Sequence, residues 1–346
     1  MPAPDSSTIR LLDASLNRAT EGLRVVDDFV RFILDDSHLT GLVKQLRHDL
    51  ATTSNVILSE QRHATRNMAG DVGASITTDS ETNREDTVAV CQASCQRTKQ
   101  SLRSLEEFSK VFDGDLAAQF EQLRYRFYEF EAALGRTLNS RERLRDIKLC
   151  VLIDGCKNED AFTTLVGQLV EAGVGMIQLR DKKLDDRDLV ERAKRLATLT
   201  RDKPTLAIIN DRADIAASAS ADGVHLGQED LAPAAARKII GPDRLIGIST
   251  HSIDQARQAV IDGANYLGAG PTFPSKTKKF DKFSGLEYLK EVATEITLPT
   301  FAIGGIDAEN LDQVIEAGIE RIALSGAVAS SQEPGKLAEN LLSKLK

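Results

Sequence analysis

Asp211 and Asp230 are the residues whose types and positions most clearly suggest chemistry. A short apolar run, Leu206 to Ile209, ends in Asn-Asp-Arg at residues 210–212, and a second run, Val224 to Leu226, leads to Gly-Gln-Glu-Asp. Two successive buried strands would thus deliver carboxylates at their carboxyl ends, which form the catalytic face of α/β barrels. Such a pair suits a hard cation such as Mg²⁺, which completes its coordination with substrate phosphates. A pair of solvated loop acids is the alternative interpretation.

An amide and two cationic side chains follow an earlier apolar run. In the stretch QLRDK, strand alternation points Gln178, Arg180 and Lys182 to the same side while the chain stays extended. An amide, a guanidinium and an ammonium group together suit a substrate with a polar head and a phosphate tail. Asn210 and Ser249 add polar groups at the ends of later runs.

The last three apolar runs end in stretches that suit phosphate. The sixth leads into GAGPTFPSKTKK, where the hydroxyls of Ser275 and Thr277 and the ammonium group of Lys278 could wrap a polyphosphate. Gly305 follows the seventh run and Ser325 follows the eighth, each beside another glycine. The backbone N–H groups of such glycine-containing turns commonly bind phosphate in these barrels. Two phosphate sites around one cavity suggest that two phosphorylated small molecules are joined and pyrophosphate leaves. The sequence has no Ser-His-Asp order, CxxC pair or HExxH motif that would indicate hydrolysis, redox or zinc chemistry.

His225 lies inside one of these apolar runs, directly after Val224. A histidine in such a run can be a packed or hydrogen-bonded core residue. Its neighbours along the chain equally favour contact with a pocket, so both interpretations stay open at this point.

The elements that would position these residues alternate between strand and helix from Ile147 onward. The expected strands are Leu149–Ile153, Met176–Leu179, Leu206–Ile209, Val224–Leu226, Leu245–Ile248, Tyr266–Ala269, Thr300–Ile303 and Arg321–Leu324. Helical patterns separate most of them, and alternating βα units of this number predict a TIM-type (β/α)₈ barrel. A doubly wound open sheet is the alternative, but the Gly-rich turn expected after its first strand is missing.

The residues before the barrel have a helical pattern. Four amphipathic helices are predicted, the first with an apolar stripe at Ile9, Leu12, Leu16, Ala19, Leu23, Val26, Val30 and Ile33. Gly22 inside this helix suggests that another backbone or a ligand approaches it there. Cys91 and Cys95, four residues apart on the third helix, could bind a metal, but small core residues are the simpler interpretation. These patterns predict an all-α helical bundle over residues 1–140 and the barrel over residues 141–346.

The composition excludes several classes of function. The 346 residues carry a net charge of −8, with 28% charged and 41% hydrophobic residues, which is ordinary for a globular protein. Neither half is basic, so nucleic acid and anionic membranes are not expected partners. No apolar run approaches the roughly 20 residues of a membrane helix, and no signal peptide is recognisable, so a cytoplasmic protein with four reduced cysteines is the default expectation.

The sequence from about Ile147 to Lys346 resembles the thiamine-phosphate synthase (thiamine-phosphate pyrophosphorylase) family. The matching stretches, in the family's order and spacing, are QLRDK, INDRADIA, ADGVHLGQED, GISTH, GAGPTFPSKTK, AIGGI and ALSGAV. The resemblance implies a TIM-type barrel that couples hydroxymethylpyrimidine diphosphate to thiazole phosphate and releases diphosphate. It also implies Mg²⁺ as cofactor and a dissociative mechanism that needs no side-chain nucleophile.

The resemblance further implies a role for each matching residue. Gln178 and His225 would contact the pyrimidine, and Asp211 and Asp230 would hold Mg²⁺. The diphosphate would be held, and its developing charge stabilised, by Arg180, Lys182, Asn210, Ser249 and Lys278, and the thiazole phosphate would be held by Ser275, Thr277, Gly305 and Ser325. Ser275 stands where many members have Thr, and Ser-Gly-Ala follows the eighth strand with less bulk than usual.

The first 140 residues resemble a helical domain that is fused to the synthase in some bacteria and is similar to a small hydroxymethylpyrimidine-phosphate kinase family. The resemblance is carried by LDASLNRATEGLRVVDDFVRF, LRHDL and DVGAS, and it implies that the chain makes its own diphosphate substrate. The candidate residues of such a kinase are Asn17, Arg18, Glu21, Arg24, His48 and Asp71. No Walker loop is present, so a dimerisation or stabilising module is the alternative.

Two rival functions remain for the barrel. A thiazole tautomerase family shares the barrel and several motifs, and a ligand-sensing barrel could carry a non-enzymatic helical interaction module. A set of charged residues argues against both, because neither function needs a diphosphate or metal site: Arg180, Lys182, Asp211, Asp230 and Lys278. The long apolar stripes of the helical region would suit a homo-oligomer as well as an intramolecular bundle.

Overall fold

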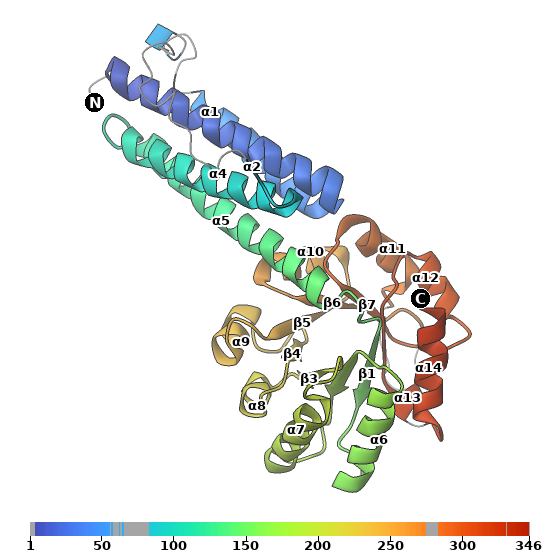
Figure 1. Ribbon diagram of the computed structural model, residues 1–346. Helices are drawn as coiled ribbons and strands as arrows, with labels where there is room; N and C mark the ends of the chain where they lie inside the picture. The colour runs from blue at the N-terminus through green and yellow to red at the C-terminus, as the bar shows by residue number, and fades with distance from the viewer. Residues whose placement is uncertain are drawn as a thin grey trace. The chain divides into compact units, whose positions relative to one another are not determined.

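The computed structural model describes residues 4–55, 57, 62, 64–65, 83–274, 283–329 and 331–345. Its contacts divide the chain into two compact units, Met1–Leu134 and Gly135–Lys346. The described part of the first unit is helical, and the second alternates strands with helices (Figure 1). Within the described residues, no helix has both the length and the apolar character needed to cross a membrane.

Three helices of the first unit begin with an aspartate cap. The unit contains α1 (Ser6–Phe29), η1 (Val30–Leu34), α2 (Ser37–Ser54), α4 (Thr87–Ser109) and most of α5 (Gly114–Arg143). Asp5, Asp36 and Asp86 each accept a hydrogen bond of 2.7 Å from the backbone N–H three residues later. Such a cap satisfies a donor that the first helical turn leaves without a partner, and it stabilises a helix by about 1 kcal/mol.

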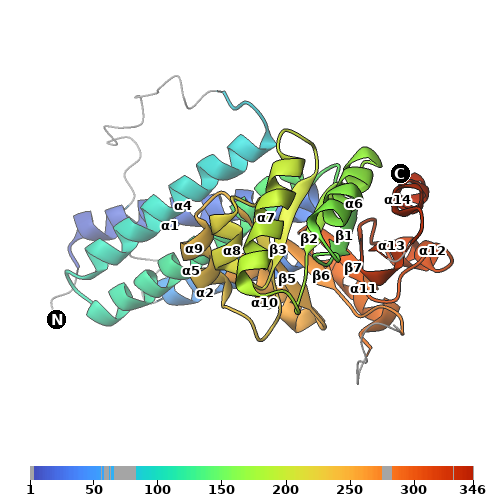
Figure 2. The same ribbon diagram turned by 90° about the horizontal axis from the view of Figure 1, so that it is seen from below.

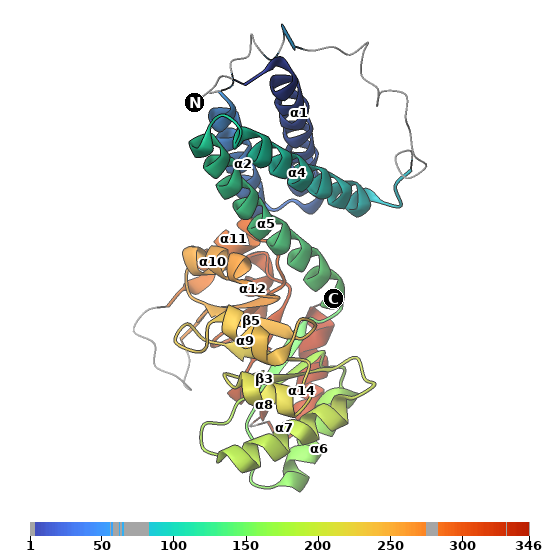
Figure 3. The ribbon, with the colours of Figure 1, turned by 90° about the vertical axis from the view of Figure 1, so that its left-hand side faces the viewer.

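Helices α1 and α4 pack extensively against each other and cross in the view of Figure 3. At Gly22 of α1, an added Cβ would lie 2.4 Å from Thr98 Oγ1 and 3.1 Å from the Ser94 carbonyl oxygen. The sequence predicted that a backbone or a ligand approaches Gly22, and the structure places the backbone of α4 there. Cys91 and Cys95 of α4 are buried free thiols, as expected for small core residues.

The apolar stripe predicted for the first helix is buried from Ile9 to Val30, but the prediction was wrong for Ile33, which is 55% exposed. The cause is the π-helical turn η1, where i→i+5 hydrogen bonding rotates each residue less than an α-helix does. Leu34, one residue later, takes the buried position. Asp35, in the left-handed region at φ 59°, then ends the helix.

The second unit is a closed barrel of eight parallel strands in sequence order, which confirms the predicted (β/α)₈ fold. The strands are β1 (Leu149–Ile153), β2 (Met176–Leu179), β3 (Leu206–Asn210), β4 (Gly223–Leu226), β5 (Leu245–Thr250), β6 (Tyr266–Ala269), β7 (Thr300–Ile303) and β8 (Ile322–Leu324). The helices are α6 (Glu159–Glu171), α7 (Asp186–Thr200), α8 (Ala213–Ser218), α9 (Pro233–Ile240), α10 (Ile253–Asp262), α11 (Gly285–Glu295), α12 (Leu311–Glu316), α13 (Gly326–Ala329) and α14 (Pro334–Lys344). Figure 2 shows α6 and α7 on the outer side of the first strands.

Apolar side chains fill the barrel interior toward the amino ends of the strands. The core cluster consists of Leu144, Ile147, Cys150, Leu152, Met176, Ile208, Leu245, Tyr266, Phe301 and Ala323. Leu144 and Ile147 precede β1, so this end of the barrel is closed from below. The expected domain boundary at residue 140 falls inside α5, where Ser140 Oγ already accepts a 3.1 Å hydrogen bond from Asn265 of the barrel unit.

Replacing Gly22 with alanine should destabilise the helical unit. The new methyl group would overlap Thr98 Oγ1 and the backbone of α4, and overpacking of this kind costs about 1–3 kcal/mol. That cost exceeds the gain of roughly 1 kcal/mol in helix propensity. Urea unfolding of the full chain, followed by helical circular dichroism, measures the change.

Gly41→Ala is the matched control, because Gly41 is an exposed glycine inside α2 with open space where its Cβ would be. This variant should gain up to about 1 kcal/mol of stability from helix propensity alone. Equal stabilisation by both substitutions would contradict the close packing of α1 on α4.

Candidate functional site

All eight strands of the barrel run in the same direction, so those predicted polar residues that lie within the described part of the chain follow strand ends at one rim. The strand register pairs Asn210 of β3 with His225 of β4 and pairs His225 with Gly247 of β5. Alternate residues of a strand point to the same side, so Ser249 lies on the same face as Gly247 and one step nearer the rim.

His225 is held inside the barrel between two hydroxyl groups. Its Nδ1 lies 3.2 Å from the Tyr266 hydroxyl and its Nε2 lies 2.9 Å from Ser249 Oγ. Burial lowers the pKa of His225 to about 4, so the ring is neutral near pH 7. Tyr266 was missed by the sequence analysis, because its contact with His225 joins positions 41 residues apart in the chain.

Two glycines leave the space that these rings occupy. At Gly247, an added Cβ would lie 2.1 Å from Tyr266 Cζ and 2.5 Å from His225 Nδ1. At Gly268, it would lie 3.1 Å from His225 Cε1. The polar rings therefore fit inside the barrel only because β5 and β6 carry no side chains at these positions.

Gln178 of β2 lies beside this group and is 3% exposed. Burial raises the pKa of Tyr266, and the nearby amide of Gln178 opposes this effect by lowering it. Gln178 Oε1 is buried and has no hydrogen-bond partner among the residues that the structure describes. A buried acceptor in this state is ready for a donor on a bound molecule.

Asp211 and Asp230 are brought together at the rim. Asp211 adopts φ 61°, and its backbone N–H donates to the His225 carbonyl oxygen at 2.8 Å. The carboxylate of Asp230 accepts a 2.6 Å hydrogen bond from the Gly227 N–H. Burial, together with the hydrogen bond and negative charge of Asp230, raises the pKa of Asp211 to about 6. Two carboxylates that oppose each other's ionisation fit a divalent cation, which would relieve the repulsion.

The cations Arg180 and Lys182 lie close enough to act on this acidic pair. Both oppose the rise in the pKa of Asp211 through their positive charges. Asp181 lies between them in the sequence. Its carboxylate does not face Asp211 but accepts hydrogen bonds from the backbone N–H groups of Gly155 and Lys183. The loop is thereby fixed with its two cations on the side of Asp211.

Arg212 anchors the loop that carries Asp211. Its guanidinium group binds the carboxylate of Asp186 at 2.6 Å and that of Asp214 at 2.7 Å. The first ion pair connects the end of β3 to the start of α7, and the second connects it to α8. Sequence analysis gave Arg212 no role because its partner Asp186 lies 26 residues away.

Gly305 and Ser325 follow the neighbouring strands β7 and β8, whose register pairs Ile303 with Ala323. Gly305 has φ 65°, and a Cβ there would lie 2.7 Å from the carbonyl oxygens of Phe273 and Pro274. The backbone after β7 thus needs glycine to pack against the segment after β6. Ser325 is exposed at the start of α13. Three further predicted residues, Ser275, Thr277 and Lys278, lie outside the described residues.

In the helical unit, the candidates Asn17, Arg18, Glu21 and Arg24 lie along α1, and His48 lies on α2; Asp71 is outside the described residues. Arg24 forms an ion pair of 3.4 Å with Asp28, and the Asn17 amide donates to Asp13 at 3.5 Å. Two buried acids of α1 were missed, Asp13 and Asp27. In the sequence, each of these two acids directly follows a residue of the apolar stripe, and this position could have identified them.

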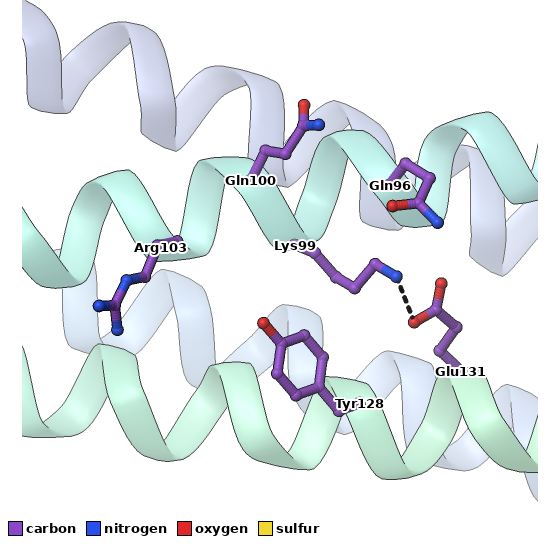
Figure 4. Close-up of a pocket in the computed structure, with 6 residues that line it drawn as sticks. All are labelled: Gln96, Lys99, Gln100, Arg103, Tyr128 and Glu131. Atoms are coloured by element: carbon purple, nitrogen blue, oxygen red, sulfur yellow. Dashed lines mark ion pairs between the residues drawn. The ribbon is translucent and has the colours of Figure 1, made fainter.

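The helical unit also has a groove of about 630 Å³ between α4 and α5, lined by Gln96, Lys99, Gln100, Arg103, Tyr128 and Glu131 (Figure 4). The ammonium group of Lys99 points at Glu131, with 2.8 Å between nitrogen and oxygen. Arg103 pairs with Glu106 and Glu107. Because these acids neutralise both cations, the groove does not offer the excess positive charge that attracts phosphate.

Comparison with known proteins finds one family match in the barrel unit and another in the helical unit. A family model described as thiamine monophosphate synthase matches residues 149–328, and one described as the ThiD2 family matches residues 10–133. A thiamine-phosphate synthase of Rhodopirellula baltica is 47% identical over 94% of this chain and 90% of its own length. One from Synechocystis is 39% identical over 99% of this chain and 98% of its own.

The barrel also resembles a solved structure. Thiamine phosphate pyrophosphorylase from Pyrococcus furiosus superposes with a TM-score of 0.52 and 35% identity. The match covers 58% of this chain and 96% of that protein. The similarity to this structure is therefore a similarity of the barrel unit.

Replacing Asp211 with asparagine should stabilise the metal-free chain at pH 7.5 more than at pH 4.5. The pKa of about 6 in the folded state lies above the ordinary value of 3.8, so the charged carboxylate lowers the free energy of unfolding above about pH 6. This penalty disappears as the pH falls through 6 toward 4, where the native carboxyl is protonated. Thermal unfolding with a chelator at both pH values measures the difference.

Asp214→Asn is the control on the same loop. The hydrogen bond from Arg212 holds the pKa of Asp214 below its usual value, so the charged form of this acid stabilises the fold and its loss should destabilise the chain at pH 7.5. A stabilisation by Asp211→Asn that does not change with pH would contradict the repulsion between Asp211 and Asp230.

Proposed function

Since this chain belongs to the thiamine-phosphate synthase family and is a transferase, we propose that its barrel couples hydroxymethylpyrimidine diphosphate to thiazole phosphate, forming thiamine phosphate and diphosphate. The observation that carries the proposal is the meeting of Asp211, Asp230, Arg180 and Lys182 at one rim. A paired carboxylate site beside two cations suits a metal-bound diphosphate, and a tautomerase or a sensor would need neither.

The diphosphate site is proposed to consist of Arg180, Lys182, Asn210, Ser249 and Lys278. Mg²⁺, held by Asp211 and Asp230, would supply Lewis-acid stabilisation of the diphosphate charge. The raised pKa of Asp211 supports this assignment, because a cation would relieve the repulsion that causes it. Among the described residues, no three His, Cys, Asp or Glu side chains form a cluster, so water and phosphate oxygens would complete the coordination.

The reaction is proposed to be dissociative. The C–O bond between the pyrimidine methylene and the diphosphate breaks first, and its electron pair leaves with the diphosphate. The nitrogen lone pair of the thiazole then captures the pyrimidine cation and forms the new C–N bond. The side chains of Arg180, Lys182 and Lys278 stabilise the negative charge that grows on the leaving group, and no side-chain nucleophile takes part.

Gln178 and His225 are proposed to contact the pyrimidine. The unpartnered Gln178 Oε1 supports this role, because an amino group on the ring would satisfy it. The neutral His225 presents no charge that would repel a pyrimidine cation. The thiazole phosphate is proposed to bind at Gly305 and Ser325 with Ser275 and Thr277, where backbone N–H groups and hydroxyls follow the last strands.

The helical unit is proposed to phosphorylate hydroxymethylpyrimidine phosphate and so to supply the barrel's substrate. The match of residues 10–133 to the ThiD2 family supports this step. The proposed residues are Asn17, Arg18, Glu21, Arg24, His48 and Asp71, which combine cations with groups able to bind metal or move protons.

A product assay on the full chain tests the synthase. With Mg²⁺, thiazole phosphate and pyrimidine diphosphate, the chain should release thiamine phosphate and diphosphate in equal amounts. Asp211→Asn should lower turnover by roughly a hundredfold or more, since it removes a ligand of the proposed metal site.

Asp262→Asn is the matched control for that assay. Asp262 ends α10, away from the carboxyl ends of the strands, so its loss should leave turnover unchanged. Full turnover in Asp211→Asn would refute the metal assignment, and no thiamine phosphate from the unmodified chain would refute the synthase proposal.

A second reaction tests the kinase. With ATP and pyrimidine monophosphate in place of the diphosphate, thiamine phosphate should still form. Arg24→Ala should abolish this reaction but leave the reaction from diphosphate intact, because only the first substrate depends on the helical unit. Product from the diphosphate alone in the unmodified chain would make the helical unit structural or regulatory.

A further inference from the structure

We propose that Gln228 is a positioning residue that fastens the loop carrying Asp230 to the backbone of Ser249, so that a metal ligand and a diphosphate ligand keep a fixed separation. The fastening itself stands on hydrogen bonds within the barrel unit. Its consequence for Mg²⁺ and diphosphate rests on the proposed function.

Strand β5 extends beyond the end of its neighbour β4. Strand β4 ends at Leu226, which pairs with Ile248, whereas β5 continues to Thr250. The Thr250 carbonyl oxygen accepts a hydrogen bond of 3.1 Å from the Gly270 N–H on the β6 side. Because successive carbonyl groups of a strand face opposite neighbours, the Ser249 carbonyl faces the β4 side, where that strand has already ended.

The side chain of Gln228 supplies a donor for this carbonyl group. Gln228 Nε2 lies 2.6 Å from the Ser249 carbonyl oxygen. A carbonyl oxygen only accepts hydrogen bonds, so the amide nitrogen of Gln228 must face it and the amide oxygen must point away. The amide thus continues the connection between β4 and β5 past the last pair of backbone residues.

Neighbouring strand ends are connected by backbone groups instead. The Asp211 N–H, after β3, donates to the His225 carbonyl oxygen of β4 at 2.8 Å. The Arg180 N–H, after β2, donates to the Ile153 carbonyl oxygen of β1 at 2.8 Å. After β4 the connection depends on a side chain, so one substitution can remove it while the backbone ladder stays in place.

Asp230 is held within the same loop by a second short contact. Its carboxylate accepts a hydrogen bond of 2.6 Å from the Gly227 N–H, and a Cβ at Gly227 would lie 2.9 Å from Asp230 Oδ2. Gly227 therefore leaves the space that the carboxylate occupies. Since Gln228 lies between Gly227 and Asp230, its contact with Ser249 fixes this loop, and the carboxylate with it, against β5.

Ser249 is fixed from two directions. Its Oγ lies 2.9 Å from His225 Nε2 inside the barrel, and its carbonyl oxygen accepts from Gln228 at the rim. Asp230 and Ser249 consequently belong to one hydrogen-bonded group. Mg²⁺ at Asp230 and diphosphate at Ser249 would meet groups whose separation is set before binding, which reduces the entropy lost when both ligands bind.

An ordinary surface contact is the competing interpretation. Gln228 is exposed, and water can replace a hydrogen bond of this kind without consequence. The two interpretations differ in ligand coupling rather than in stability. A positioning residue changes the factor by which Mg²⁺ and diphosphate strengthen each other's binding, whereas a surface contact leaves that factor unchanged.

Calorimetry on the full chain with Mg²⁺ and inorganic diphosphate tests the role. Gln228→Met keeps the length of the side chain but removes its N–H donor. The factor by which Mg²⁺ strengthens diphosphate binding should fall about tenfold in this variant, as loss of a supporting partner commonly causes. The affinity for diphosphate without Mg²⁺ should stay nearly the same.

Turnover gives a second reading of the same variant. Formation of thiamine phosphate by Gln228→Met should fall at limiting Mg²⁺ and return toward the original rate when Mg²⁺ is in excess. Excess Mg²⁺ would not restore a rate that was lost because the protein had unfolded. A loss that excess Mg²⁺ leaves unchanged would therefore contradict a role in holding the metal ligand.

Gln258→Met is the matched control. Gln258 is an exposed glutamine of α10, and its Nε2 donates to Asp262 at 2.8 Å, so this variant loses a comparable contact that does not involve the rim. Its coupling factor should equal that of the unmodified chain. Thermal unfolding should show that both variants are folded.

The outcomes separate this inference from the proposed function. If the unmodified chain shows coupling and Gln228→Met retains all of it, the positioning role is overturned and the synthase proposal stands. An equal loss of coupling in Gln258→Met would also overturn the role, because the effect would not be specific to the rim. An unmodified chain without coupling would overturn the inference together with the proposed metal-assisted site.

Discussion

The closed ring of eight parallel strands is the constraint on which the proposed site depends. Parallel strands that close in sequence order place every carboxyl end at the same rim, so residues far apart in the chain become neighbours. Asp211 and Asp230 meet there at the ends of β3 and β4, and the cations after β2 lie close enough to influence their ionisation. The amino ends hold the apolar cluster instead, so stability and chemistry occupy opposite ends of one interior.

Glycine makes close contacts possible in both units. In the barrel, Gly247 leaves the space in which Tyr266 and His225 meet, and in the helical unit Gly22 lets α4 approach α1. The purposes differ. The barrel uses the space to bury two polar rings with their hydrogen bonds satisfied, whereas the bundle uses it to bring two backbones together. In both units, the missing side chain is as specific a structural feature as the groups that it admits.

Much of the barrel could be predicted because the information is local. Apolar runs mark the strands, and every observed strand lies within two residues of its predicted bounds. The meeting of Asp211 and Asp230 followed from strand order alone. Tyr266 could not be predicted, because its hydrogen bond to His225 joins positions 41 residues apart through a gap left by a third strand. The exposure of Ile33 depends on one π-helical turn, which leaves no signal in an apolar periodicity.

Binding of inorganic diphosphate to the full chain, measured by calorimetry with and without Mg²⁺, tests the central claim that this rim is a metal-assisted diphosphate site. Linkage requires that if Mg²⁺ strengthens the binding of diphosphate, diphosphate strengthens the binding of Mg²⁺ by the same factor. Tight binding is expected only when diphosphate and Mg²⁺ are both present, and the coupling between them should be lost when Arg180 is replaced by alanine. Diphosphate binding of equal strength without Mg²⁺ would contradict this claim.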